Sequence, residues 1–206
     1  MKCCMQKIID GLSLEIPIDV YDPAEDSFLL AENVLDLTNE KVLEVGSGSG
    51  YVSIYLSKKF PKTEFFCIDI NPIAARSTKK NAKRNSANLE VINSDLFNAL
   101  LSKKYSQFFD LVLFNSPYLP VKDFGSLEQA WSGGIDGLDV IKPFLNALPF
   151  YLKNSGCCYL VVSSKTNLAL LENMIEFQGF NCLIKDKIVE GKESILLYYL
   201  EKKIID

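Results

Sequence analysis

The sequence predicts an α/β protein whose mostly parallel seven-stranded sheet ends in an antiparallel hairpin. From residue 41 onward, short apolar runs alternate with segments of helical periodicity, which is typical of parallel strands joined by crossover helices. After Gly179 this alternation stops, because two β-rich runs follow each other with only the turn at 190–193 between them. These two observations indicate the fold class.

The individual elements are expected from the same patterns. The parallel strands are expected at 42–45, 64–69, 89–93, 109–114 and 157–162, and the hairpin strands at 180–189 and 194–200. A helix is expected at 23–37 with Asp22 as its N-cap, and a second at 71–85 with Asn71 as N-cap before Pro72. Two more helices are expected at 139–152 and 166–178.

Length and composition predict one compact domain, residues 1–206, with residues 1–20 as a short N-terminal extension. The net charge of -4 disfavours a nucleic-acid substrate, because duplex binding needs a basic surface. No apolar run approaches the roughly 20 residues that span a bilayer. The six cysteines form no C-x-x-C pair, so reduced thiols and a cytoplasmic location are expected, with a nuclear one also compatible.

The chain contains no histidine, and this absence restricts its chemistry. Ser-His and Cys-His nucleophile pairs, histidine metal ligands and the commonest general base are all excluded. We therefore expect no metal site and a reaction that proceeds without imidazole.

A glycine-rich loop, Gly46-Ser47-Gly48-Ser49-Gly50, follows the strand at 42–45, and Asp69 ends the next strand. Such a loop lets a ligand approach the backbone, and a carboxylate at the strand end can accept both hydroxyls of a ribose. The dinucleotide pattern G-x-G-x-x-G fails, because Tyr51 stands where its last glycine belongs. With Glu44 two residues before Gly46, the loop favours a cationic cofactor, S-adenosylmethionine.

Asp95 and Leu96 directly follow the strand at 89–93 and its Ser94. The Asp95 carboxylate is a candidate partner for the adenine amino group, and the backbone N–H of Leu96 for the ring. Each acid taken alone could equally be a helix cap or a turn residue. Their order at successive strand ends favours the cofactor site, since open α/β sheets bind ligands there.

The tetrapeptide Asn115-Ser116-Pro117-Tyr118 follows the apolar run 109–114. It indicates methylation of a planar nitrogen, whose delocalised lone pair makes it a poor nucleophile. The Asn115 side chain and the Ser116 carbonyl could each accept one N–H, while the Tyr118 ring stacks on the amide plane and holds a near-attack geometry. An asparagine that only caps the following turn would not explain the adjacent Pro117 and Tyr118.

Several of these motifs together resemble the eukaryotic and archaeal HemK-like protein methyltransferases. The resemblance starts near Val20 and rests on Asp22-Pro23-Ala24-Glu25-Asp26-Ser27, the glycine loop, Asp69-Ile70-Asn71-Pro72, the tetrapeptide and Trp131-Ser132-Gly133-Gly134. It implies a three-layer, Rossmann-like class I fold that uses S-adenosylmethionine. It also implies N5-methylation of the glutamine in the Gly-Gly-Gln loop of a class I translation release factor. The implied cofactor contacts are Ser27, Glu44, Gly46, Asp69, Asp95, Leu96 and Asn115.

The resemblance also implies a partner, a small zinc-binding activator that would form a heterodimer by covering the edge strand at 89–93. The segment 119–137, with Trp131, is expected to cover the pocket. The chain departs from the family at Ser116, where relatives usually carry proline, so a cofactor-binding homologue with weak or no activity stays open. The other alternative is an adenine-N6 nucleic-acid methyltransferase, because the same tetrapeptide can hold an exocyclic amine.

Overall fold

The structure, a computed structural model, describes residues 4–117 and 137–203. Its strands are β1 (Cys4–Ile9), β2 (Leu12–Pro17), β3 (Lys41–Val45), β4 (Glu64–Asp69), β5 (Leu89–Asn93), β6 (Phe109–Asn115), β7 (Leu152–Ser163), β8 (Phe180–Glu190) and β9 (Glu193–Lys202). Its α-helices are α1 (Glu25–Asn33), α2 (Tyr51–Lys59), α3 (Pro72–Arg84), α4 (Ile141–Tyr151) and α5 (Leu168–Phe177), and 3-10 turns lie at Leu96–Leu100 and Lys103–Tyr105.

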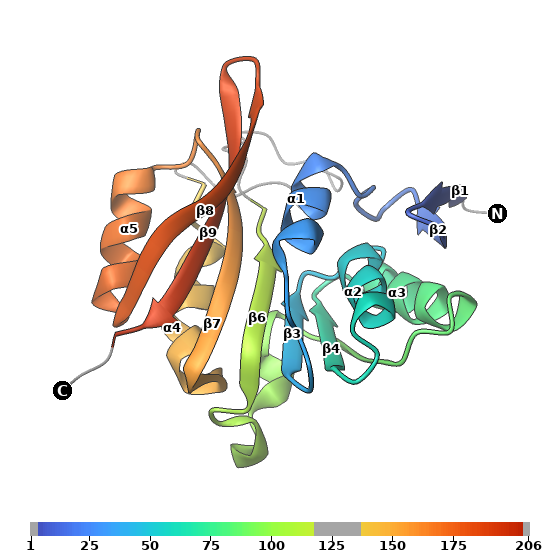
Figure 1. Ribbon diagram of the computed structural model, residues 1–206, viewed down its shortest axis with the longest axis horizontal. Coiled ribbons are helices and arrows are strands. Elements are labelled where there is room, and N and C mark those ends of the chain that lie inside the picture. The colour runs from blue at the N-terminus through green and yellow to red at the C-terminus, as the bar shows by residue number, and fades with distance from the viewer. Residues whose placement is uncertain (1–3, 118–136, 204–206) are drawn as a thin grey trace. The chain divides into compact units, whose positions relative to one another are not determined.

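The strand order of the main sheet is β5-β4-β3-β6-β7-β9-β8, and β1 and β2 form a separate two-stranded sheet (Figure 1). Pairing is parallel for β3 with β4, β4 with β5 and β6 with β7. It is antiparallel for β9 with both β7 and β8. The predicted fold class, a mostly parallel seven-stranded sheet that ends in an antiparallel hairpin, is confirmed.

Two compact units follow one another along the chain, residues 1–101 and residues 102–206. The first contains both strands of the small sheet, α1 to α3 and β3 to β5; the second contains β6 to β9, α4 and α5. The expectation of one domain over residues 1–206 stays a prediction.

In the first unit, α2 and α3 pack on strands β4 and β5. The helix α3 begins as predicted, because the Asn71 side chain accepts the backbone N–H of Ile73 at 2.9 Å and Pro72 occupies the first turn. This cap places the start of α3 directly after the carboxyl end of β4, where Asp69 lies. The local sequence therefore fixes the direction in which the chain leaves the candidate site.

The helix expected at 23–37 is shorter, spanning Glu25–Asn33, and Asp22 is not its cap. Ala24 occupies the N-cap position without a side-chain bond, while the Asp22 carboxylate forms an ion pair with Lys7 of β1. The local sequence predicts the Asp22 carboxylate as the helix cap, but this carboxylate binds Lys7 of β1 instead.

The segment treated as a short extension folds into the hairpin β1–β2, joined at Asp10-Gly11. Leu12, Leu14 and Ile16 are buried along one face of β2, and β2 packs against α3, beside which Figure 1 draws it. Alternate burial along β2 is the period of a strand with one face on a core. The segment 12–17 thus contributes to the core of the first unit.

In the second unit, α4 packs on β7 and α5 packs on β8. The β6 strand is anchored near its end by Phe114, whose ring centroid lies 4.6 Å from that of Phe144 in α4, and both rings are buried. Burial of this ring pair holds the residue that follows, Asn115, at the carboxyl end of a rigid strand. No helix within the described residues is long and apolar enough to cross a membrane.

Candidate active site

The glycine loop at 46–50 turns between β3 and α2. Gly46 donates its backbone N–H to the carbonyl of Ile68 at 2.8 Å, which ties the loop to the end of β4. Gly48 has a φ of +57°, in the left-handed region that glycine adopts without strain. A Cβ placed on Gly48 would lie 4.0 Å from the Cβ of Tyr21, an ordinary van der Waals separation. The left-handed φ, rather than lack of space, therefore accounts for glycine at this position.

Asp69 and the loop are in direct contact. One carboxylate oxygen of Asp69 accepts the N–H of Gly48 at 2.8 Å, and the other accepts the N–H of Asn71 at 2.8 Å. Burial raises the pKa of Asp69, although these two bonds work in the opposite direction. The structure therefore brings Asp69 and Gly48 together. Each carboxylate oxygen keeps a further lone pair for a hydroxyl donor.

Glu44 is buried, with 4% of its surface exposed. One of its oxygens accepts the backbone N–H of Ser53 in α2 at 3.1 Å and the Ser53 hydroxyl as well. Burial raises the pKa of Glu44 to about 8, against the lowering effect of the Ser53 bonds and together with repulsion from Asp69. In this structure Glu44 holds the start of α2, and its predicted cofactor contact remains a prediction.

The turn after β5 carries the two candidate adenine contacts. Leu96 has a φ of +42°, a left-handed conformation that a branched side chain rarely adopts and that is often found at functional sites. Ser94 stabilises it, donating its hydroxyl to the Leu96 carbonyl at 2.8 Å and accepting the N–H of Ala99 at 2.9 Å. Asp95 is exposed beside this turn. Sequence reasoning missed Ser94, although a serine that begins a turn is a recognised signal.

Ser27 lies in the first turn of α1 and is buried. The neighbouring Asp26 organises this turn, accepting the Ser27 N–H at 2.6 Å and the hydroxyl of Tyr21 at 2.9 and 2.8 Å. Tyr21 is also the residue closest to the empty side-chain position of Gly48. The structure thus connects the predicted contact Ser27 to the glycine loop through Asp26 and Tyr21, which the sequence did not single out as site residues.

The second unit contains the predicted methyl-transfer residues. Asn115 is the last residue of β6 and lies opposite Val161 of β7. The Ser116 side chain is 3% exposed, and its hydroxyl donates to the Val161 carbonyl at 2.8 Å. Pro117 follows and is half-buried. Tyr118 and the segment 118–136, which includes Trp131, lie outside the described residues.

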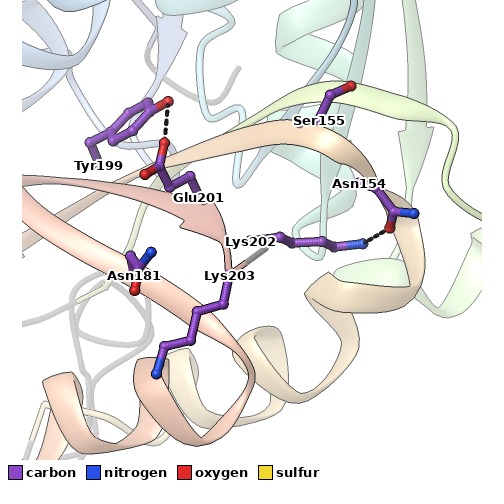
Figure 2. Close-up of a pocket in the computed structure, with 8 residues that line it drawn as sticks. Asn154, Ser155, Asn181, Tyr199, Glu201, Lys202 and Lys203 are labelled. Atoms are coloured by element: carbon purple, nitrogen blue, oxygen red, sulfur yellow. Dashed lines mark hydrogen bonds between the residues drawn. The ribbon is translucent and has the colours of Figure 1, made fainter. Parts of the chain in front are cut away.

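A cavity of about 510 Å³ lies elsewhere in the second unit and is lined mainly by polar side chains (Figure 2). Asn154 and Ser155 border it near the start of β7, and Tyr199 and Glu201 border it near the end of β9. Val161 lies seven positions after Asn154 in β7, which is roughly 23 Å at the usual rise per strand residue. This cavity is therefore distant from the Ser116 anchor and is not a candidate for methyl transfer.

Comparison with known proteins identifies the family. The sequence profile of the methyltransferase small domain matches residues 21–183. The chain belongs to the methyltransferase small domain family. The matched range includes every predicted site residue, from Ser27 to Tyr118.

Curated relatives of this methyltransferase cover nearly its whole length. It is 37% identical to a Methanocaldococcus jannaschii protein whose name gives protein N5-glutamine methyltransferase as a provisional activity, over 92% of this chain and 95% of the relative. It is 38% identical to the human methyltransferase HEMK2, over 86% of this chain and 87% of the relative. The resemblance inferred from the motifs is confirmed.

Solved structures agree with this assignment. The E. cuniculi Mtq2–Trm112 complex, described as responsible for methylation of the eRF1 translation termination factor, matches with a TM-score of 0.71 at 25% identity, over 90% of this chain and 100% of the matched chain. A T. thermophilus 16S rRNA N2 G1207 methyltransferase, solved with AdoMet and guanosine, matches with a TM-score of 0.70 at 20% identity, over 98% of this methyltransferase and 50% of that chain. The second likeness shows the shared fold alone.

Proposed function

We propose that this methyltransferase transfers a methyl group from S-adenosylmethionine to the N5 amide nitrogen of the glutamine in the Gly-Gly-Gln loop of a class I translation release factor. The single observation that carries the proposal is Asn115-Ser116-Pro117 at the end of β6, with Ser116 anchored on β7. The similarity to HEMK2 and to the Mtq2 complex supports a protein amide as the substrate.

The first unit fits S-adenosylmethionine as its cofactor. Gly48 offers bare backbone and Asp69 offers two carboxylate oxygens beside it, which suits the two hydroxyls of a ribose. Leu96 holds a strained backbone conformation at the end of the next strand, where its N–H would meet the adenine ring. Glu44 and Ser27 complete the proposed contacts. No phosphate group is present in this cofactor, and the net negative charge of the chain agrees with its cationic sulfonium.

The tetrapeptide would bind and orient the substrate amide. Asn115 accepts one N–H of the glutamine through its side-chain oxygen, and the backbone carbonyl of Ser116 accepts the other. Two acceptors in fixed positions define the amide plane, and Tyr118 would stack on it. Orientation of this kind is a large part of the rate enhancement when the nucleophile is intrinsically weak.

Loss of the amide proton needs no dedicated base. When bound, S-adenosylmethionine supplies an electrophilic methyl group on a positively charged sulfur. An amide nitrogen that has gained a methyl group while keeping both protons is a strong acid, so water can remove one of them. This agrees with a chain that contains no histidine.

Methyl transfer from labelled cofactor to a purified release factor tests the proposal. The release factor is used with its Gly-Gly-Gln glutamine intact or changed to alanine, with and without the activator subunit. We expect label only on the intact factor. A signal that survives the glutamine change, or no signal under either condition, would sink the proposed function.

We further propose that a small zinc-binding activator covers the edge of the sheet at β5. The strand order places β5 at an edge, and an uncovered edge exposes backbone groups that invite pairing. The side chain of Val91 is buried against Cys67 and Ala75, so the partner would meet the strand backbone and the half-buried Ile92 rather than Val91. The complex of Mtq2 with Trm112 supports a heterodimer.

Co-purification of tagged activator with two variants tests this surface. Ile92→Arg on β5 should abolish capture, because a charge would lie in the proposed interface. Leu35→Arg is the control, since Leu35 is 58% exposed and follows α1. Equal capture of both variants, or a soluble and fully active single chain, would exclude the proposed edge contact.

The alternative of an adenine-N6 nucleic-acid methyltransferase predicts a different result. Binding to DNA or RNA would weaken steeply with salt, and label would appear on nucleic acid. The net charge of -4 argues against it.

We propose a cytoplasmic location for this methyltransferase. The free thiols of Cys67, Cys157, Cys158 and Cys182 agree with it.

A further inference from the structure

The helix α3 turns an unusual row of polar residues toward the interior of the first unit. Ser77, Thr78 and Asn81 are at most 3% exposed, and Asn85 at the C-cap is half-buried. Burial of polar side chains is unfavourable unless hydrogen bonds satisfy them. Each of the four side chains forms hydrogen bonds. Their partners lie in strand β2 and in the glycine loop at 46–50.

Asn81 bonds to both the N-terminal hairpin and the glycine loop. Its side-chain oxygen accepts the N–H of Glu15 in β2 at 2.8 Å. Its amide nitrogen donates to the carbonyl of Glu15 at 3.0 Å and to the carbonyl of Ser49 at 2.9 Å. One side chain thus pairs with β2 as a neighbouring strand would and also holds the loop.

Asn85 makes the same bonds to β2 without reaching the loop. Its oxygen accepts the N–H of Ser13 at 2.9 Å, and its nitrogen donates to the carbonyl of Ser13 at 2.9 Å. Four residues of helix rise about 6 Å and two residues of strand about 6.7 Å. This near match lets Asn81 and Asn85 meet Glu15 and Ser13 in register.

Thr78 bonds to the glycine loop, and Ser77 bonds to β2. The Thr78 hydroxyl donates to the carbonyl of Gly48 at 3.1 Å and contacts the Ser47 hydroxyl at 3.0 Å. The Ser77 hydroxyl donates to the carbonyl of Glu15 at 2.9 Å. Thr78 and Asn81 therefore bind loop carbonyls, whereas Ser77 and Asn85 bond to β2 and to Asn81 but not to the loop.

These contacts orient the loop from behind. The carbonyls of Gly48 and Ser49 are bound by α3, while the N–H of Gly48 is bound by Asp69. Because N–H and carbonyl groups of the loop are both hydrogen-bonded within the protein, the loop has its conformation before any ligand arrives. Preorganisation of this kind raises affinity, because binding then needs no further ordering of the loop.

We propose that Asn81 is a positioning residue for the cofactor and that the hairpin β1–β2 supports it, so that the N-terminal residues act on cofactor affinity through Asn81. The inference rests on the cofactor site of the proposed function. It gives a role to the hairpin of residues 4–17: Glu15 holds the Asn81 amide in the orientation that reaches Ser49.

Four matched variants test the proposal by calorimetric titration with S-adenosylhomocysteine and by thermal unfolding. Asn81→Ala and Thr78→Val lose a bond to the loop. Asn85→Ala and Ser77→Ala lose bonds to the hairpin and to Asn81 but none to the loop. We expect a Kd about tenfold higher for the first pair, the size of one buried hydrogen bond. The Kd of the second pair should stay within about twofold of the Kd of the unchanged protein. The Tm should fall in both pairs.

Steady-state kinetics add a readout that general destabilisation would not move. In the first pair the KM for S-adenosylmethionine should rise while kcat changes less than about twofold, because the transfer residues are untouched. If Asn81→Ala does not fold, the nearly isosteric Thr78→Val still tests loop positioning, and a double variant Ser13→Pro, Glu15→Pro tests the hairpin. If the change in Kd parallels the fall in Tm across all variants, or if Kd does not change in any of them, the proposal is wrong.

The outcomes separate this inference from the proposed function. Tight cofactor binding without transfer to a release factor would remove the proposed substrate and leave the Asn81 result standing. No binding of S-adenosylhomocysteine by the unchanged protein would remove the cofactor site and this inference together.

Discussion

The hydroxyl of Ser116 donates a hydrogen bond to the backbone carbonyl of Val161 at 2.8 Å, in a position where the serine is 3% exposed. This bond ties the residue after β6 to the neighbouring strand β7. The resemblance to the family predicts proline here, which would limit the loop through its fixed φ. The serine restrains the same residue by a different means, so the departure from the family pattern does not leave position 116 loose.

Replacing Ser116 should separate the two ways of restraining the loop. Ser116→Ala removes the bond and leaves the Val161 carbonyl without that donor, which should cost about 1–2 kcal/mol of unfolding free energy. We expect kcat to fall roughly tenfold, because the carbonyl that orients the substrate amide becomes mobile. Ser116→Pro should equal or exceed the unchanged protein in kcat. Similar activity of all three in the labelled-methyl assay would show that the bond does not matter for catalysis.

Glu44 should make stability depend on pH. Its carboxyl has an ordinary pKa of 4.5 and a folded-state pKa of about 8, raised by burial. Between these values the folded chain binds a proton that the unfolded chain releases, so this contribution is complete below about pH 4.5 and is lost as pH rises through about 8. Unfolding by urea at pH 5 to 9 should show the decline. Glu44→Gln, which keeps the shape without titrating, should flatten it, and an unchanged slope would contradict the assignment.

Most of the fold followed from patterns that local physics controls. The strands β4 and β5 were predicted at their observed bounds, and Asn71 caps α3 as expected. The candidate site was partly predictable for a related reason: parallel strands gather their carboxyl ends at one edge, so Gly46, Asp69 and Asp95, at or just after the ends of β3, β4 and β5, were natural candidates.

The parts that were missed depend on contacts between distant residues. Asn81 meets Glu15 across 66 positions of sequence, and a single polar residue within a helix pattern gives no sign of such a partner. The hairpin β1–β2 had a usable local signal, since Asp10-Gly11 between alternating apolar residues is typical of a tight turn. Helix α1 was drawn too long because its apolar spacing continues past Asn33, whereas the backbone becomes extended at Val34.

The packing of α3 on the glycine loop predicts a strong effect of a small change. Gly50 has a φ of +85°, and a Cβ added to it would lie 2.9 Å from Cγ2 and 3.2 Å from Cα of Thr78. Gly50→Ala should therefore combine a backbone cost of about 1–2 kcal/mol with an overpacking cost of about 1–3 kcal/mol. Urea unfolding measures the sum.

Gly191→Ala is the matched control for this effect. Gly191 has a φ of +61°, and among the described residues no atom lies within 4 Å of an added Cβ, so it carries the backbone cost alone. Gly50→Ala should be the less stable variant and should also bind S-adenosylhomocysteine more weakly. If the two alanine variants lose equal stability, α3 does not restrict the loop as the distances imply.

Asn115→Ala should abolish methyl transfer at saturating cofactor. The change removes the side-chain oxygen that would accept one amide N–H, and we expect kcat to fall at least about 100-fold, as for other lost orienting groups. Saturation matters because Asn115 is also a predicted cofactor contact. Asn154→Ala, in the cavity near the start of β7, removes the same group far from Val161 and should keep its activity. Loss of transfer in both variants would point to a fault in the second unit as a whole, and loss in neither would exclude Asn115 as the residue that holds the glutamine.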